Sequence, residues 1–333
     1  MGWKGTVRSI NASHRQYERE AQRRQRELER QRQQLEKMEE LERAAYEVQV
    51  YENYIDLLIS VHKECSDLWD WEIIRTTEPP IKPEKSQNNE ELAQAKRNKF
   101  KPGVFDKMLK RVESKLDKLA MIVEEARQAD EKKYRESVHS FEQKYADWEA
   151  TLELAERMLS GNTKAYIDAI RQTDPFNDIS KLGSSLDFKA ESISIVNATL
   201  HVNSEEVIPS EVKSLLKSGK LSVKQMPKGK FYELYQDHIC SCVLRIAREL
   251  FALLPIEMVL VNCLGNLLNS QTGYMEEKSI LSVAIPRKTL EGLNFEMLDP
   301  SDSMSNFIHR MAFKRTTGFG AVESLKVSDL QTK

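Results

Sequence analysis

The chain has 333 residues, which is enough for two domains on length alone. Its 50 lysine and arginine residues nearly cancel 52 aspartate and glutamate residues, which excludes an overall electrostatic field that would favour nucleic acid or an acidic substrate. Charged residues make up 31% of the chain and hydrophobic residues 40%, a balance that indicates a solvated helical part beside a folded core.

The expected location is the cytoplasm. No apolar stretch typical of a signal peptide follows Met1, and the most apolar window, residues 251–268, is interrupted by Pro255 and Glu257. A membrane span needs about 20 mainly apolar residues, so we expect a soluble protein. The four cysteines form no CxxC pair, and we expect them to be reduced packing residues.

A long helix is predicted at the start of the chain. Residues 11–71 contain neither proline nor glycine, and apolar residues recur every three or four positions. At about 1.5 Å per residue, this helix would be roughly 90 Å long. It must end near Pro79, because proline lacks the amide donor and clashes with the preceding turn. We expect a loop over residues 79–103, with a short helix at residues 90–98.

A second long helix is predicted from Phe105 to Ala155, where apolar residues alternate steps of four and three in a heptad seam. Asp130 interrupts that seam, and Gly161 ends the helix. Two such helices joined by a loop predict an antiparallel, coiled-coil-like helical hairpin over residues 1–160. Because a lone hairpin buries only one seam, we expect it to bind protein partners and to form a homo-oligomer.

The first predicted helix begins with a basic stretch. Residues 15–34 carry seven arginines against four glutamates. One hypothesis is that Arg23, Arg24 and Arg26 contact nucleic acid or an acidic partner. The alternative is a solvated helix that is held by Glu–Arg pairs four residues apart, such as Glu20 and Arg24.

Residues 161–333 are predicted to form an α+β globular domain, an antiparallel sheet of order ββαββα with helices on one face. A short helix over residues 163–173 leads into it. Alternation from Val196 to Val202 predicts that every second residue there faces the core. The predicted elements are strands 186–189 and 192–202, a helix at 231–254, strands 257–267 and 279–285 joined by a turn at 269–273, and a helix from its cap Asp299 through Met311.

The loop expected between the second strand and the central helix is the main electrostatic feature of the chain. From Val212 to Tyr232 it contains six lysines and no acidic residue. One hypothesis is that these lysines bind phosphates or an acidic partner. The alternative is a solvated lysine loop. The six are Lys213, Lys217, Lys220, Lys224, Lys228 and Lys230.

The sequence carries no catalytic motif that we can identify. It has neither a glycine-rich phosphate loop nor an HExxH zinc motif. Glu276-Glu277-Lys278 lacks the spacer of the acid-x-lysine triplet that a metal-dependent nuclease places on a strand. We therefore predict no catalytic residue, metal or cofactor, and we keep a cryptic metal-dependent nuclease as an alternative.

Short motifs in a fixed order carry one resemblance. They are an Arg/Gln-rich helical start, Trp69-x-Trp71 before a proline loop, Tyr145-Ala146-Asp147-Trp148-Glu149, Val207-Ile208-Pro209, Tyr232-Glu233-Leu234-Tyr235, Arg248-Glu249-Leu250-Phe251-Ala252, Leu281-Ser282-Val283 and Leu298-Asp299-Pro300. Together they resemble the non-catalytic region of bacterial restriction-type antiphage defence proteins, in which a coiled-coil region and an α+β module precede a restriction-endonuclease-like domain. Because this sequence ends near Lys333 without a nuclease domain, the resemblance implies that a nuclease or ATPase is a separate partner.

The first hypothesis for function is a non-enzymatic scaffold subunit of a bacterial defence or nucleic-acid-processing complex, with the helical hairpin for assembly and the lysines for phosphate. The second is a purely structural oligomerising protein that contacts no nucleic acid. Binding to DNA or RNA that weakens with salt would favour the first.

Overall fold

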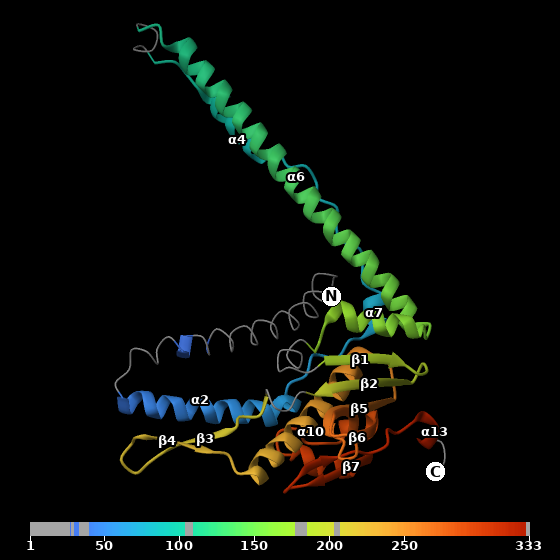
Figure 1. The fold of residues 1–333 in the computed structure, drawn as a ribbon. Helices are drawn as coiled ribbons and strands as arrows, with labels where there is room; N and C mark the ends of the chain where they lie inside the picture. The colour runs from blue at the N-terminus through green and yellow to red at the C-terminus, as the bar shows by residue number, and fades with distance from the viewer. Residues whose placement is uncertain are drawn as a thin grey trace. The chain divides into compact units, whose positions relative to one another are not determined.

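The structure is a computed structural model that describes residues 27, 30–32, 40–103, 109–176, 185–202 and 207–330. In this part of the chain the protein is α+β, with a six-stranded mixed sheet and a two-stranded sheet (Figure 1). Its residues divide into two compact units. The first, which we call the arm, comprises residues 73–153, and the second, the sheet unit, comprises residues 40–72 and 154–330. No helix within the described ranges has the length and apolar character needed to cross a lipid bilayer.

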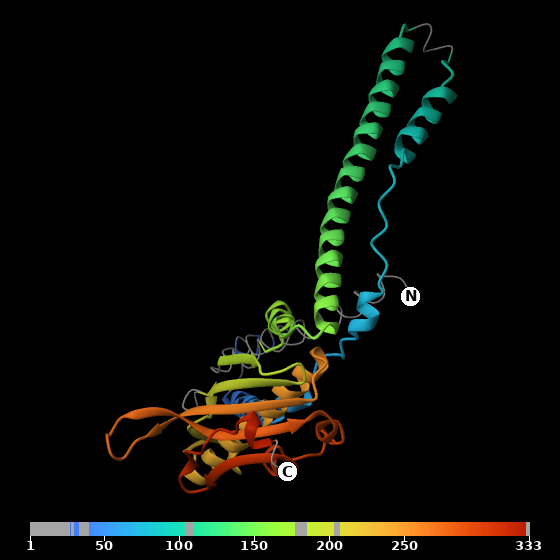
Figure 2. The same ribbon diagram turned by 90° about the vertical axis from the view of Figure 1, so that its right-hand side faces the viewer.

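The arm is built on α6 (Val112–Leu159), a helix of 48 residues whose last turn and a half belongs to the sheet unit. This helix confirms the second long helix of the prediction, and it ends before Gly161 as expected. An extended segment, residues 77–87, and α4 (Asn88–Lys99) run beside α6 (Figure 2). Pro79, Pro80 and Pro83 keep that segment out of a helix, because proline cannot continue one.

The first predicted helix lies elsewhere than expected. α2 (Glu40–Ser60) and η1 (Val61–Lys63) belong to the sheet unit, where both pack on α10 (Lys228–Leu253). The structure therefore differs from the predicted hairpin, because the apolar stripe of α2 is covered by α10 and not by α6. The boundary expected at residue 160 changes with it, since residues 40–72 lie with the sheet.

The predicted helix also stops at Ser60 rather than near Pro79. Beyond η1 the backbone bonds to α10 in place of its own preceding turn. Trp69 N donates to Ala252 O at 2.8 Å, and the indole Nε1 of Trp71 donates to Leu253 O at 2.7 Å. The amide of Trp69 is a group that a continued helix would satisfy internally, and its bond to α10 replaces that helical bond where a stretch without proline or glycine leaves the helix.

The large sheet has the strand order β1-β2-β5-β6-β7-β8. β2 and β5 pair in parallel, whereas the other neighbours are antiparallel, so the fully antiparallel sheet of the prediction is wrong. The reason is α10, which carries the chain across the sheet between β2 and β5, and such a crossover joins parallel strands. The strands are β1 (Ser185–Ala190), β2 (Ile195–Val202), β5 (Met258–Leu268), β6 (Met275–Pro286), β7 (Ile308–Lys314) and β8 (Gly318–Gly320).

Several local predictions are confirmed. α7 spans Thr163–Thr173, and the side chain of Asn162 caps it by accepting from Lys164 N. Every second residue of β2 from Val196 to Val202 is buried, and β5 and β6 form the expected hairpin. The short remaining helices are α3 (Trp71–Arg75), α11 (Arg287–Glu291) and α13 (Val327–Leu330).

Two other predicted elements are wrong, so the order ββαββα does not hold. The lysine loop contains a hairpin, β3 (Glu211–Leu215) and β4 (Leu221–Gln225). The helix expected through Met311 is only α12 (Pro300–Ser303) and η2 (Met304–Asn306), because the chain enters β7 at Ile308. Its cap is as predicted, since Asp302 N donates to Asp299 Oδ1 at 3.0 Å.

Candidate functional site

Few side chains along the arm are fully buried. Among residues 76–103 and 109–150, the buried side chains are those of Ala93 and Asp130 alone. Several large apolar side chains between 40% and 63% exposed lie near the start of α6 and on α4. They are Leu92, Leu109, Leu116, Met121 and Ile122. An element of this length without a closed core is typical of a surface that packs against another chain.

Asp130 fixes the position of α4 along α6. Its Oδ2 accepts from the backbone amides of Asn89 at 3.0 Å and Glu90 at 2.9 Å, and its Oδ1 accepts from Asn89 Nδ2 at 2.7 Å. A carboxylate at a helix start satisfies amides that have no partner within the helix. The residue that interrupts the heptad seam is therefore the cap of α4. Two further contacts join α6 to the extended segment, residues 77–87. They are Lys85–Glu131 at 2.6 Å and Trp148 Nε1 to Thr77 O at 3.1 Å.

The six predicted lysines fall into two sets on the lysine hairpin (residues 211–230). Lys213 bonds to Glu47 at 3.0 Å and so attaches the hairpin to α2, whereas Lys220 forms a more exposed pair with Glu40 at 3.6 Å. α2 packs on both β3 and β4. These two lysines are therefore engaged within the sheet unit, which leaves them less suited to a ligand.

The other four lysines have no acidic partner in the part of the chain that the structure describes, and all four are exposed. Lys224 is on the face of the hairpin opposite to Lys213, because Lys213 pairs with Val223 and neighbouring side chains alternate. Lys228 and Lys230 lie in the first turn of α10, which has no acidic residue. Lys217 is in the turn of the hairpin. Arg23, Arg24 and Arg26, the other predicted contacts, lie outside the described residues.

Two buried histidines lie beside a serine and a cysteine, residue types that act as nucleophiles in enzymes, but here their contacts are structural. The Nδ1 of His62 is 2.9 Å from Ser241 Oγ, yet Ser241 is fully buried and also accepts from His62 N. The Nδ1 of His238 is 2.9 Å from Leu58 O, and its Nε2 is 3.7 Å from Cys242 Sγ. Burial raises the pKa of Cys242 to about 12, which keeps the thiol neutral and unreactive. Both histidines attach the α2–η1 segment to α10.

The acidic pair of the nuclease alternative is divided between two faces of β6. Glu276 bonds to Lys278 at 3.0 Å, and Glu277 bonds to His201 Nδ1 at 2.7 Å on the opposite face. His201 Nε2 is 3.2 Å from Asp187 Oδ2, and the hydrogen bond to Glu277 raises the pKa of His201. Within the described ranges no three His, Cys, Asp or Glu side chains lie close enough to hold a metal ion. Glu276 and Glu277 therefore do not face one shared ion.

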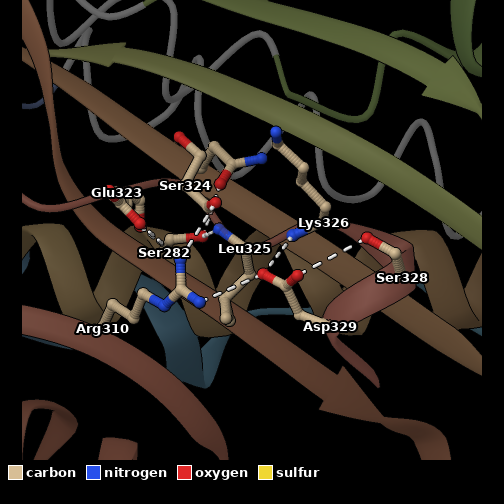
Figure 3. A network of polar contacts seen from close by, with 9 residues as sticks. Ser282, Arg310, Glu323, Ser324, Leu325, Lys326, Ser328 and Asp329 are labelled. Carbon is tan, nitrogen blue, oxygen red and sulfur yellow. Dashed lines mark hydrogen bonds and ion pairs between the residues drawn. The ribbon is translucent and has the colours of Figure 1, made fainter. Parts of the chain in front are cut away.

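Residues 321–330, which we call the strap, lie on the face of the sheet opposite to α10 (Figure 3). Helix α10 covers the other face, where Tyr235 Oη approaches Gly265 of β5. Leu325 is the one strap residue that is buried, in a cluster with Leu260 of β5 and Ala284 of β6. Leu325 N also donates to Ser282 Oγ at 2.8 Å. Nothing in the sequence pattern predicted this segment.

Side chains hold the strap more than its backbone does. Val322 N donates to Ser279 O at 2.8 Å, the one backbone bond from strap to sheet among the described residues. Arg310 of β7 donates to the carbonyls of Glu323 and Ser324 and bonds to Asp329 Oδ2 at 3.1 Å.

Comparisons with family models, with curated proteins and with solved structures found no match to the chain. The resemblance to restriction-type defence proteins therefore stays a prediction.

Proposed function

We propose that the protein is a non-enzymatic assembly subunit whose arm packs against the arm of another copy. One observation carries this proposal. Among residues 76–103 and 109–150 the arm buries only Ala93 and Asp130, while the apolar side chains near the start of α6 stay exposed. Packing two arms together would remove that surface from water, at about 25 cal/mol per Å² of apolar area. The resemblance adds a class of further partner, a separate nuclease or ATPase of a bacterial defence complex.

Light scattering of the full chain tests this role, because a monomer has a mass of 38.5 kDa. We expect a larger species with a defined stoichiometry, and we expect the double substitution Leu116→Glu/Ile122→Glu to return it to the monomer mass. The matched control is Leu268→Glu, which changes an exposed leucine of the sheet unit and leaves the mass unchanged. A wild-type chain that stays at the monomer mass up to high concentration contradicts the proposal.

A second candidate function is the binding of phosphate groups or an acidic polymer by the lysine hairpin. The observation that favours it is the set of four exposed lysines without a described acidic partner, namely Lys217, Lys224, Lys228 and Lys230. Lys228 and Lys230 add to the positive end of the α10 dipole, so an anion there would relieve an unfavourable arrangement. Each phosphate that is neutralised makes binding weaken with salt.

Fluorescence anisotropy with a labelled 20-nucleotide DNA strand, at low and high salt, tests this second function. We expect the quadruple alanine variant at Lys217, Lys224, Lys228 and Lys230 to bind at least tenfold more weakly and with a smaller salt dependence. The control removes the same charge from exposed arm residues, as alanine at Lys96, Lys132, Lys133 and Lys144. Equal loss in both variants indicates an effect of net charge alone, and no loss in the first contradicts the candidate.

A further inference from the structure

We propose that the sheet face beneath the strap is a peptide-docking groove, which the chain's own residues 321–330 fill. In trans the groove takes an extended segment of the same chemistry, a leucine with a carboxylate four residues after it. This proposal does not depend on the role of the arm, because strap and groove lie wholly within the sheet unit.

The groove has an apolar floor with a row of hydrogen-bonded polar side chains across it. Leu260 and Ala284 form the floor, and each is only 1% exposed. Beside them Asn262 Nδ2 donates to Asn197 Oδ1 at 3.0 Å, and Ser282 Oγ donates to Asn262 Oδ1 at 2.5 Å. This row runs from β2 through β5 to β6. It ends at the Ser282 hydroxyl, which has a lone pair left for the amide of the docked segment.

That amide is the one of Leu325, which donates to Ser282 Oγ at 2.8 Å. The hydrogen bond and the apolar floor act on the same residue, so they select both its side chain and its register. A residue without a buried apolar side chain would leave Leu260 and Ala284 exposed. A segment shifted by one residue would turn its amide away from Ser282.

Arg310 recognises the two ends of the segment (Figure 3). Its guanidinium donates to the carbonyls of Glu323 and Ser324, lies 3.6 Å from the Glu323 carboxylate, and bonds to Asp329 Oδ2 at 3.1 Å. Asp329 is held for this contact because its Oδ2 also accepts from Lys326 N at 3.2 Å. A planar guanidinium with several donors suits carbonyl and carboxylate acceptors together, which argues for recognition of a defined peptide rather than of a lone acid.

The strap is held in a way that allows exchange. It is not a strand of the sheet, since one backbone bond, from Val322 N to Ser279 O, joins it to β6 among the described residues. Glu323 is 94% exposed in its side chain, so its ion pair with Arg310 contributes little. A competing segment that offers the same leucine and the carboxylate four residues after it therefore replaces the main contacts that the strap loses.

A labelled peptide of residues 319–333 is the probe for this groove. In the full chain we expect Leu325→Asp to weaken the resident strap, so that the variant binds the fluorescein-labelled peptide at least tenfold more tightly than the wild type does. A peptide that itself carries Leu325→Asp should not bind. Adding Arg310→Ala to the Leu325→Asp chain should lower affinity for the probe at least tenfold. Leu268→Asp, an exposed site on the β5–β6 hairpin, is the control and should behave as the wild type.

Hydrogen exchange of the wild-type chain gives a second measurement that needs no variant. We expect the amides of Val322 and Leu325 to exchange at least a hundredfold faster than those of Val261 and Val283 in the sheet, because the strap opens without global unfolding. Equal protection at these four positions shows that the strap is a fixed part of the core and overturns the proposal. Probe binding that is the same in the wild type and in both Leu325→Asp chains, with or without Arg310→Ala, overturns it as well.

Discussion

The arm and the sheet unit are both rich in helix, yet they differ in what covers those helices. In the sheet unit, α10 is buried along most of its length between the sheet and the α2–η1 segment. In the arm, α6 is flanked by one extended segment and one short helix, and among its residues from 112 to 150 only Asp130 is buried. A helix whose apolar face packs on the rest of the chain is stabilised by that packing. In α6 the apolar side chains whose burial would stabilise the helix are exposed. The sheet unit is therefore the part with its own buried core, and under the proposed function the arm is stabilised by packing against a second copy.

The largest effect is expected from Glu249→Ala in the sheet unit. Arg245 and Glu249 form an ion pair at 2.9 Å, both side chains are at most 2% exposed, and Glu249 Oε1 also accepts from Ser66 N. Removing one partner of a buried pair leaves an uncompensated charge, which lowers the free energy of unfolding by about 3–5 kcal/mol. Urea denaturation of the full chain, followed by near-ultraviolet circular dichroism, measures the change.

The chain offers a matched control for that substitution. Arg287 and Glu291 form an ion pair with the same four-residue spacing at 3.3 Å, but Glu291 is 59% exposed. Glu291→Ala should cost less than about 1 kcal/mol, as is usual for surface pairs. Equal costs at both sites would mean that burial does not set the stability of the sheet unit.

A somewhat smaller loss is expected from Gly318→Ala. Gly318 has a φ of +77°, and a Cβ there would lie 2.7 Å from the ring of Tyr232. The left-handed backbone costs an alanine about 1–2 kcal/mol, and the crowding about 1–3 kcal/mol more. Gly273 has a φ of +75° but no atom within 4 Å of its Cβ position, so Gly273→Ala should show the backbone cost alone. Thermal unfolding of both variants separates the two contributions, and identical melting temperatures would contradict the crowding at Tyr232.

Elements that depend on local pattern were predictable from the sequence. The heptad seam gave α6, two-residue alternation gave the buried face of β2, and Asp299 before Pro300 gave the cap of α12. The partner of α2 was not predictable, because an apolar stripe shows that a helix is covered and not what covers it. The same limit applies to the parallel pairing of β2 with β5, which depends on where α10 returns the chain.

For the candidate surfaces, the sequence located charge but not its neighbours. The six lysines were evident, yet the ion pair of Lys213 with Glu47 spans 166 residues and has no local signal. The hairpin that carries them did have one, since Ser218-Gly219 separates two short runs with alternating side chains. The many lysines favoured a solvated loop, and the prediction of a loop there was wrong. The strap was not predictable, because it is held by Arg310 and Ser282. No sequence pattern marks these two residues, and only the fold brings them together.

Lowering the pH from 7.5 to 5.0 should weaken the sheet unit through its buried histidines. Burial lowers the pKa of His62 and of His238 below the ordinary value of 6.5, so both are neutral in the folded unit. Below pH 6.5 the unfolded chain binds protons that the folded unit does not, and the free energy of unfolding falls as the pH falls. The hydrogen bond to Glu277 raises the pKa of His201, whose contribution has the opposite sign and is lost as the pH rises through that value.

Urea midpoints at pH 7.5 and pH 5.0 measure this dependence. We expect the midpoint of the wild-type sheet unit to decrease between the two values, and to decrease less in His238→Gln, which lacks one of the titrating groups. His139→Gln, at an exposed position of α6, should keep the wild-type decrease. If His238→Gln shows the full wild-type decrease, the buried histidine at the α2–α10 contact is not a source of the pH dependence.

The smallest and most local effect is expected from Asp130→Ala, which acts on the arm alone. The substitution removes the carboxylate that accepts from the amides of Asn89 and Glu90, and loss of a helix cap costs about 1 kcal/mol. Because the arm has so few fully buried side chains, that loss should release α4 from α6 without changing the urea midpoint of the sheet unit. Hydrogen exchange over residues 89–99 should accelerate about fivefold, as follows from a loss of about 1 kcal/mol at about 1.4 kcal/mol per factor of ten.

Asp147→Ala is the control. It removes a carboxylate from an exposed position of the same helix, and it should leave the exchange of residues 89–99 unchanged.

The two variants also distinguish the effect of the helix cap from the effect of oligomer formation. If arms pack against one another through the start of α6, then oligomers should protect residues 89–99 in the wild type, and dilution to the monomer should reproduce part of the acceleration that Asp130→Ala causes. Protection of α4 that is independent of both Asp130 and concentration would mean that the arm is stable by itself, and the contrast between the two units would not hold.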